Sequence, residues 1–180
     1  MFLDRDGVIN EKAPEGEYIR SAAEFHLLPG VPQAIARLNQ AGLRTVVVSN
    51  QRGIAKGLYT AGDVEAIHRA MRETLAGDGA RLDAIFVCPH DKGECRCRKP
   101  LPGMFQQAVG AFPGIKAAES VMIGDALADI EFGRGLGMPT ILVEGAPERH
   151  KPDLAEAIRL ADWRVSSLSE AVDLLLRGQR

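Results

Sequence analysis

The chain has 180 residues, 22 of them Lys or Arg and 24 Asp or Glu, which gives a formal net charge of −2 at pH 7. Hydrophobic residues make up 46% and charged residues 26%, so the composition is globular and too apolar for a disordered chain. The near-zero charge argues against nucleic-acid binding, for which a strongly basic balance is expected. No apolar run approaches about 18 residues, and Asp4 interrupts the first one, so we expect no signal segment, no membrane partner and a cytoplasmic protein.

Short β-branched runs alternate along the chain with segments of helical periodicity. In chain order, the expected strands are Met1–Asp4, Leu43–Ser49, Ala84–Val87, Ser120–Gly124, Thr140–Val143 and Trp163–Val165. The expected helices are Val31–Ala41, Asp63–Leu75, Met104–Phe112, 128–136, Leu154–Ala161 and Leu168–Leu176. Continuous apolar strands that alternate with helices indicate a parallel sheet covered on both faces. We therefore predict one α/β domain over residues 1–180, three-layered and Rossmann-like, with no insertion long enough for a separate cap domain.

The predicted sheet also indicates where the chemistry should lie. Ligands of open parallel sheets bind beyond the carboxyl ends of the strands. Functional residues are therefore expected just after Leu3, Val48, Val87 and Ile123. The walls of the site are expected to be the three longest irregular stretches, Arg5–Pro29, Asn50–Gly62 and Cys88–Pro102.

Polar residues of suitable chemistry follow these strands. Asp4 and Asp6, two residues apart, could converge on a hard cation such as Mg²⁺, although Asp-x-Asp-Gly is also common turn sequence. Ser49 could hold phosphoryl oxygens or simply end a strand, and Lys99 could neutralise an anion or lie at the surface. Each signal is weak alone, but together they predict one site.

Two further acidic residues follow the fourth predicted strand. Asp125 is placed to complete a metal site with Asp4, and Asp129, four residues later, could support Lys99 or the waters of the metal. The alternative roles are helix capping for Asp125 and compensation of the helix dipole for Asp129. Both kinds of role are compatible with each other.

The three cysteines all lie between positions 88 and 97, which does not resemble a secreted disulfide framework. Cys88-x-His90 and Cys95-x-Cys97 supply three sulfurs and one imidazole, a closed four-ligand set suited to structural zinc. The alternative is free thiols beside a surface histidine. We predict a zinc loop over residues 88–97.

The motifs FLDRDGVIN, VVVSNQ, CRKP and MIGDALAD, in this order, resemble the haloacid dehalogenase (HAD) superfamily of phosphohydrolases. More narrowly, LDRDGVIN, SNQRGIAKG and CPH with CRCRKP resemble the heptose 1,7-bisphosphate 7-phosphatases and the related histidinol-phosphate phosphatases. The resemblance implies a HAD-like fold, a nucleophile at Asp4 that forms an aspartyl-phosphate, and a general acid and base at Asp6. It further implies Mg²⁺ on Asp4, Asp125 and the Asp6 carbonyl, phosphate held by Ser49 and Lys99, and zinc in the loop.

The same resemblance places Asn50, Gln51, Arg52 and Arg98 against the substrate. The cationic side chains favour a sugar phosphate with a second phosphate, and hence the heptose 7-phosphatase activity. Histidinol-phosphate phosphatase is the alternative, disfavoured because Arg52 stands where an acidic residue would suit an ammonium-bearing substrate. A phosphorylated receiver domain for signalling, or a zinc-dependent interaction module, are the non-enzymatic alternatives. We expect a monomer. Ala126 departs from the polar or basic residue expected after Asp125.

Overall fold

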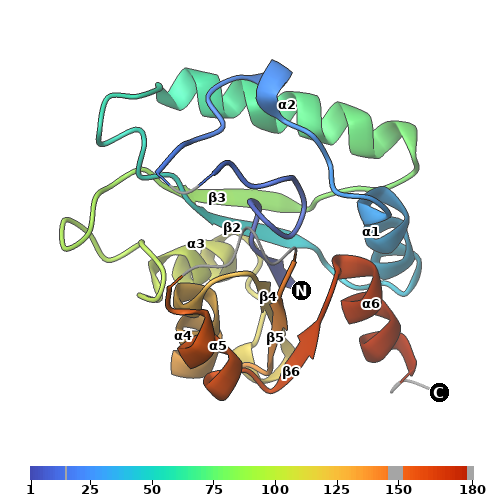
Figure 1. Ribbon diagram of the computed structural model, residues 1–180. Coiled ribbons are helices and arrows are strands. Elements are labelled where there is room, and N and C mark those ends of the chain that lie inside the picture. The colour runs from blue at the N-terminus through green and yellow to red at the C-terminus, as the bar shows by residue number, and fades with distance from the viewer. Residues whose placement is uncertain (15, 146–151, 178–180) are drawn as a thin grey trace.

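A six-stranded parallel sheet runs through the computed structural model, which describes residues 1–14, 16–145 and 152–177 (Figure 1). The strands are β1 (Phe2–Leu3), β2 (Val46–Asn50), β3 (Ala84–Cys88), β4 (Met122–Gly124), β5 (Thr140–Val143) and β6 (Trp163–Val165). Their order is β3-β2-β1-β4-β5-β6, so the strand order reverses between β1 and β4. A reversal of this kind opens a crevice at the carboxyl ends of the two central strands.

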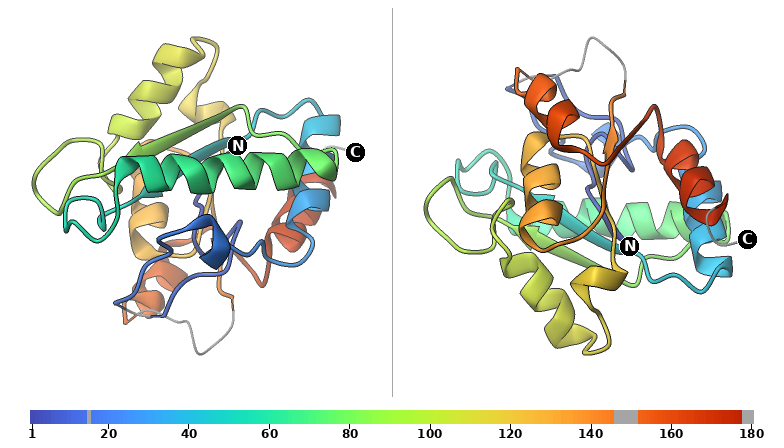
Figure 2. Two further views of the ribbon diagram at one scale, coloured as in Figure 1. Left: turned by 90° about the horizontal axis from the view of Figure 1, so that it is seen from above. Right: turned by 90° about the horizontal axis from the view of Figure 1, so that it is seen from below.

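Helices cover both faces of the sheet (Figure 2). The helices are α1 (Val31–Gln40), α2 (Ala61–Gly77), α3 (Gly103–Ala111), α4 (Leu127–Gly135), α5 (Leu154–Leu160) and α6 (Leu168–Arg177), with 3₁₀ turns η1 (Ala22–Glu24) and η2 (Ala117–Glu119). α1, α2 and α6 pack on one face, and α3, α4 and α5 pack on the other. This architecture confirms the predicted three-layer Rossmann-like class. None of the helices in the described ranges is long and apolar enough to span a membrane.

The alternation of side chains along each strand explains why both faces need a helical layer. Phe2, Val46 and Val48 point into the cluster that α3 and α4 complete. Leu3 and Val47, their neighbours in sequence, point into the cluster under α1, α2 and α6. Because successive strand residues face opposite sides, an uninterrupted apolar run is buried only when both faces are covered.

The expected boundaries differ from the observed ones at the start of the second strand and at the start of the second helix. The second strand begins at Val46 instead of Leu43, because Thr45 Oγ1 donates to Arg81 O at 2.8 Å and ties the preceding turn to the entry of β3. The second helix begins two residues before Asp63. Thr60 and Asp63 form a capping box, in which the Thr60 hydroxyl accepts from Asp63 N at 3.1 Å and the Asp63 carboxylate accepts from Thr60 N at 2.7 Å.

Candidate active site

Three carboxylates converge at the carboxyl ends of β1 and β4. Asp4 directly follows β1, Asp125 directly follows β4, and Asp129 lies in the first turn of α4. Each offers one oxygen, and these oxygens all lie within 4.8 Å of one another. Asp4 and Asp129 are buried, with 9% and 1% of their surfaces exposed. The structure thus brings together two side chains that lie 121 positions apart in the sequence, as the strand-end argument predicts.

Two glycines allow these carboxylates to approach the backbone. A Cβ atom at Gly124 would lie 2.2 Å from the Cβ atom of Asp129, closer than real Cβ atoms approach. A Cβ atom at Gly7 would lie 2.5 Å from an oxygen of Asp125, and Gly7 has a φ of +91°, which L side chains rarely adopt. Both glycines of the DRDG and IGD motifs therefore serve the packing of the acidic cluster.

Lys99 supplies a buried ammonium group to this cluster. Its Nζ atom lies 2.8 Å from Asp4 Oδ1 and 2.5 Å from Asp129 Oδ1, and it donates to Val48 O at 2.6 Å. Burial acts to lower the pKa of Lys99, but the charges of Asp129 and Asp4 raise it above its ordinary value, so the amine stays charged. Asp129 uses its other oxygen to accept from the backbone N–H of Ala126 at 3.1 Å.

The acidic cluster has the character of a site for a hard divalent cation. Burial raises the pKa of Asp4 to about 7, and the negative charges of Asp129, Asp125 and Asp6 act in the same direction. The positive charge of Lys99 opposes them by lowering this pKa. Carboxylate oxygens are the ligands that Mg²⁺ prefers, and a cation there would relieve this repulsion. The residues present therefore fit the predicted Mg²⁺.

The Asp6 carboxylate is not part of this cluster and accepts a separate set of hydrogen bonds. Arg5 Nη2 donates to both of its oxygens, at 2.9 and 3.0 Å, and Asn10 and Gln51 each donate an N–H at 3.0 Å. Burial acts to raise the pKa of Asp6, but the Arg5 guanidinium and these hydrogen bonds lower it below its ordinary value. The side chain is thus held as an oriented carboxylate beside the metal site.

Gln51 connects Asp6 with the predicted phosphate-binding hydroxyl. Its Nε2 atom donates to Ser49 Oγ at 2.7 Å and to Asp6 Oδ2 at 3.0 Å. Its Oε1 atom accepts from the Tyr59 hydroxyl at 2.8 Å. Ser49 and Gln51 are 1% and 3% exposed. The Gln51 amide, predicted to contact substrate, therefore forms hydrogen bonds that link Asp6, Ser49 and Tyr59.

His68 lies behind Asp6, on the buried face of α2, and is 2% exposed. Its Nε2 atom lies 3.3 Å from Arg5 Nη1. Burial lowers the pKa of His68 to about 3, and the nearby Arg5 and Arg72 charges act in the same direction. The imidazole is consequently neutral at neutral pH.

We expect this neutral imidazole to make the folded state sensitive to acid. The unfolded chain binds a proton at His68 near pH 6.5, whereas the folded chain does so only near pH 3, so stability is lost as pH falls between these values. The loss at pH 5 relative to pH 8 amounts to about 2 kcal/mol of unfolding free energy. Urea unfolding of the wild type and of His68→Gln at both pH values measures it. An equal loss in the two proteins would contradict the assignment.

The predicted zinc ligands also come together. Cys95 Sγ lies 3.5 Å from Cys88 Sγ and 3.4 Å from Cys97 Sγ, and His90 Nδ1 lies 3.8 Å from Cys88 Sγ and 3.4 Å from Cys97 Sγ. Sulfur ligands ~2.3 Å from a tetrahedral zinc ion would be separated by roughly 3.8 Å, so the donor set and its spacing fit this metal. Burial raises the pKa of Cys88 to about 12, which a thiolate-binding cation would reverse.

The cluster anchors the loop that carries Lys99. Cys88 is the last residue of β3 and is buried, and Cys97 precedes Lys99 by two positions. Asn50 fixes the backbone of Lys99 directly, since its amide donates to Lys99 O at 3.2 Å and accepts from Lys99 N at 3.0 Å. Arg98 donates to His90 O at 3.3 Å. Asn50 and Arg98, predicted to contact substrate, thus hold this loop in the present arrangement.

A cavity of about 590 Å³ opens beside Asp6. Its lining includes Asn50, Gln51 and Arg52 of the predicted substrate wall. Arg52 reaches across to the loop of residues 88–97, where its Nη2 atom donates to Asp91 Oδ2 at 3.0 Å. Lys12 and Lys92 also line the cavity, and residues 13, 14 and 16–19 form its opposite wall. The mouth of the site therefore carries the predicted Arg52 together with Lys12 and Lys92, which were not predicted, and the acidic Glu17 and Asp153. Arg98, the other predicted cation, is not part of this lining.

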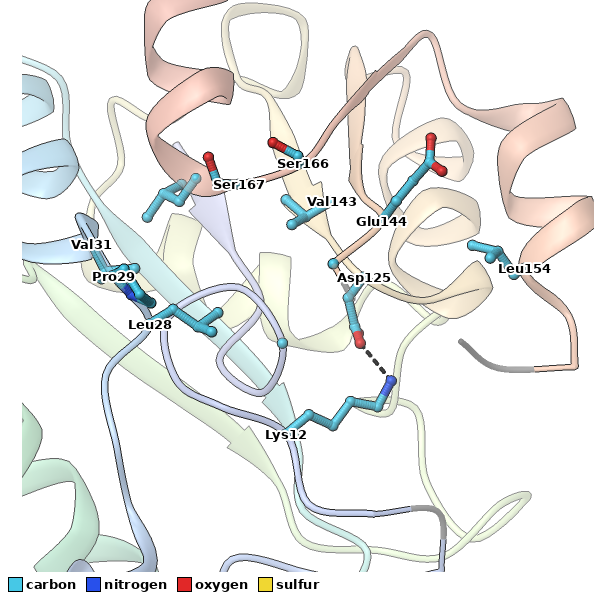
Figure 3. A pocket seen from close by; sticks show the side chains of 13 residues that line it. Lys12, Leu28, Pro29, Val31, Asp125, Val143, Glu144, Leu154, Ser166 and Ser167 are labelled. Carbon is cyan, nitrogen blue, oxygen red and sulfur yellow. Dashed lines mark hydrogen bonds and ion pairs between the residues drawn. The ribbon is translucent and has the colours of Figure 1, made fainter. Parts of the chain in front are cut away.

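Lys12 is the functional candidate that the sequence analysis missed. Its Nζ atom lies 2.6 Å from Asp125 Oδ2, and its side chain is 19% exposed. The two side chains point toward each other in Figure 3. Lys12 and Asp125 also line a second cavity of about 270 Å³, beside Val143, Ser166 and other residues of the β5 and β6 ends. Lys12 comes from an irregular loop, so no periodicity or spacing points to it.

Comparisons with known proteins identify the family of this chain. The HAD-hydrolase-like family profile matches residues 96–171. A D-glycero-alpha-D-manno-heptose-1,7-bisphosphate 7-phosphatase of Mycobacterium tuberculosis is 41% identical over 137 residues, covering 76% of this chain and 72% of that protein. The corresponding beta-heptose phosphatase of Pseudomonas aeruginosa is 39% identical over 145 residues, covering 80% of each chain.

A solved structure shows the same relationship over nearly the whole chain. The D,D-heptose 1,7-bisphosphate phosphatase from Bordetella bronchiseptica, solved with magnesium and phosphate, superposes with a TM-score of 0.86 at 34% identity. The match covers 99% of this chain and 98% of that one. These relatives are phosphatases, which sets aside the signalling-receiver and zinc-module alternatives. The chain belongs to the HAD-like hydrolases, in the family of the heptose 1,7-bisphosphate 7-phosphatases.

Proposed function

We propose that this phosphatase removes the 7-phosphate of a D-glycero-D-manno-heptose 1,7-bisphosphate through an aspartyl-phosphate on Asp4. The single observation that carries the proposal is the meeting of Asp4, Asp125 and Asp129, with Lys99 paired to Asp4 and Asp129 and with Asp6 held beside them. This arrangement keeps the nucleophile Asp4 and the cation site apart from Asp6, the acid and base. A two-step phosphoryl transfer needs this separation of roles.

In the first step, an oxygen of Asp4 attacks phosphorus, and the bond from phosphorus to the sugar oxygen breaks. Lys99 and Ser49 hold the phosphoryl oxygens. Asp4, Asp125 and the Asp6 carbonyl would hold Mg²⁺, which would supply positive charge that lowers the repulsion between carboxylate and phosphate. Asp6 gives its proton to the departing sugar oxygen. The Arg5 guanidinium keeps Asp6 ionised in the free protein. Asp6 therefore takes up its proton when the phosphate dianion binds, because this negative charge raises the proton affinity of the carboxyl.

In the second step, Asp6 is again a carboxylate, exposed over 28% of its side chain. It takes a proton from water, and the water oxygen attacks the phosphorus of the aspartyl-phosphate. The bond from phosphorus to Asp4 breaks, which releases inorganic phosphate and restores the free carboxylate. The hydrogen bonds from Arg5, Asn10 and Gln51 keep Asp6 deprotonated and fix its orientation, so that the carboxylate is available to accept the proton.

The cationic mouth supports a bisphosphate over a monophosphate substrate. Arg52, Lys12 and Lys92 line the cavity beside Asp6, where a second, uncleaved phosphate could pair with them. Histidinol phosphate has no second phosphate to pair with these cations, and its ammonium group gains nothing from them. The relatives include phosphatases named for the alpha anomer and for the beta anomer. We therefore propose the heptose bisphosphate as substrate without assigning its anomer.

We propose that the Cys88, His90, Cys95 and Cys97 cluster binds structural zinc and that the enzyme acts as a monomer. Four ligand atoms close together leave no open position for water, so the metal would order the loop and take no part in hydrolysis. The whole of residues 1–180 would form one domain, with its own loops recognising the substrate.

Substrate choice tests this function. We expect Mg²⁺-dependent phosphate release from the heptose 1,7-bisphosphate, with kcat/KM at least about 100-fold above that for histidinol phosphate, because a paired second phosphate is worth on the order of 3 kcal/mol. Arg52→Gln should lower kcat/KM for the bisphosphate and leave the heptose 7-monophosphate unaffected. Phosphate-release assays on both anomers of the bisphosphate, on histidinol phosphate and on the 7-monophosphate measure these differences. Faster turnover of histidinol phosphate would overturn the substrate assignment.

A further inference from the structure

His68 is a buried polar side chain that the proposed mechanism does not use. It lies on the face of α2 that otherwise buries Val64, Ile67, Met71 and Leu75. A buried imidazole among apolar neighbours needs a hydrogen-bond partner, because desolvation without one is unfavourable. Its partner is a guanidinium nitrogen of Arg5, at 3.3 Å.

The chemistry of the two groups fixes the state of the imidazole. A guanidinium has only N–H donors and no acceptor. The ring nitrogen that faces it must therefore carry a lone pair, so His68 is neutral, with its hydrogen on Nδ1 and its Nε2 accepting. A second N–H at Nε2 would point directly at a cation 3.3 Å away.

Arg5 is held at two sites at once. It is 1% exposed, and it donates to Asp6 through Nη2, at 2.9 and 3.0 Å, and through Nε, at 3.2 Å. Its remaining nitrogen, Nη1, is the one that meets His68. Because the guanidinium is planar and rigid, fixing Nη1 also fixes the plane in which the other two nitrogens meet the carboxylate.

We propose that His68 is a positioning residue for the phosphatase reaction, in which its Nε2 lone pair fixes the Arg5 fork that orients the Asp6 carboxylate. The inference rests on the proposed function, since it takes Asp6 as the acid and base. His68 itself touches no reacting group in this arrangement. It acts through Arg5, from a helix that lies outside the motifs by which the family is recognised.

A matched pair of variants separates this role from simple packing. Gln and Met have similar length, but only Gln offers an acceptor near the place of Nε2. We expect His68→Met to lower kcat by about tenfold with KM changed less than about twofold, because a misplaced acid and base slows the chemistry without weakening binding. His68→Gln should retain kcat within about threefold. Thermal unfolding of both variants at pH 8 reports whether each is folded.

The outcomes distinguish this inference from the function on which it rests. A wild-type protein that releases no phosphate from any of the sugar phosphates would refute the proposed function. Active wild type with equal kcat in His68→Met, His68→Gln and the parent would refute the positioning role alone. Long-range ¹H–¹⁵N NMR spectra of the histidine rings give a readout that needs no activity. We expect the Nδ1–H form of His68 in the wild type and its loss in Arg5→Met; an Nε2–H form in the wild type would overturn the inference.

Discussion

Replacing Asp4 by Asn is expected to lower kcat by at least about 10⁴-fold while the chain stays folded, the scale seen when a covalent nucleophile is removed. The amide cannot attack phosphorus, although it nearly matches the carboxylate in size. Asp4 lies 2.8 Å from Lys99 Nζ, so the variant also removes one of the two carboxylates that hold this amine. Steady-state phosphate release with saturating Mg²⁺ measures the effect.

Thermal unfolding supplies the control for Asp4→Asn. Burial and three neighbouring carboxylates raise the pKa of Asp4 to about 7, so its charge opposes folding in the metal-free protein as pH rises above the ordinary carboxyl range. The metal-free variant should therefore melt no lower than the metal-free wild type at pH 8. It should also lose the rise in Tm that Mg²⁺ gives the wild type, because a metal that binds the folded state stabilises it. Retained turnover in a folded variant would contradict the role of Asp4.

Replacing Cys95 by Ser is expected to remove bound zinc and to lower stability and activity together. A structural zinc ion contributes on the order of 10 kcal/mol to the fold of a small metal-binding segment, and losing even a few kcal/mol would lower Tm by about 10 °C. We expect kcat to fall at least about tenfold, because the loop between Cys88 and Cys97 leads directly into Lys99. Metal analysis, calorimetry and phosphate release report the three effects.

Glu94→Gln provides a matched control within the same loop. Glu94 accepts from the backbone N–H of Asp91 at 2.9 Å and is not one of the four clustered ligands, so this variant should keep its zinc, its Tm and its activity. Wild-type protein purified without chelator and lacking zinc would contradict the metal assignment. Unchanged kcat in a zinc-free Cys95→Ser would show that the loop positions Lys99 without the metal.

Much of the site could be predicted because it follows from topology. Parallel strands share one carboxyl edge, and β1 and β4 are direct neighbours in the sheet, so the residues that follow them lie close together. This reasoning located Asp4, Asp125 and Lys99 together, and local spacing alone located the cysteine and histidine cluster. Small errors in strand and helix ends did not affect it, since the polar residue that follows each strand marks the edge.

The rest depends on side-chain packing, which spacing along the sequence does not encode. Gln51 was expected to contact substrate, and it lines the cavity beside Asp6, but the sequence did not indicate that its amide also holds Asp6 and Ser49 in place. Arg5 lies between two aspartates in the motif, and the sequence assigns it no role. Its side chain is nevertheless buried and donates to both carboxylate oxygens of Asp6. Lys12 lies in an irregular loop that folds back onto Asp125. Only the tertiary structure brings such pairs together.

Chemical trapping of the phosphorylated enzyme tests the central claim most directly. The wild type is mixed with heptose bisphosphate and Mg²⁺, quenched in acid within the first turnover, and treated with borohydride, which reduces an acyl phosphate to an alcohol. Peptide mass spectrometry should find homoserine at position 4, and none at position 6 or 125. Full phosphate release during the first turnover with position 4 unmodified throughout would contradict the account, because water would then attack the substrate phosphorus directly.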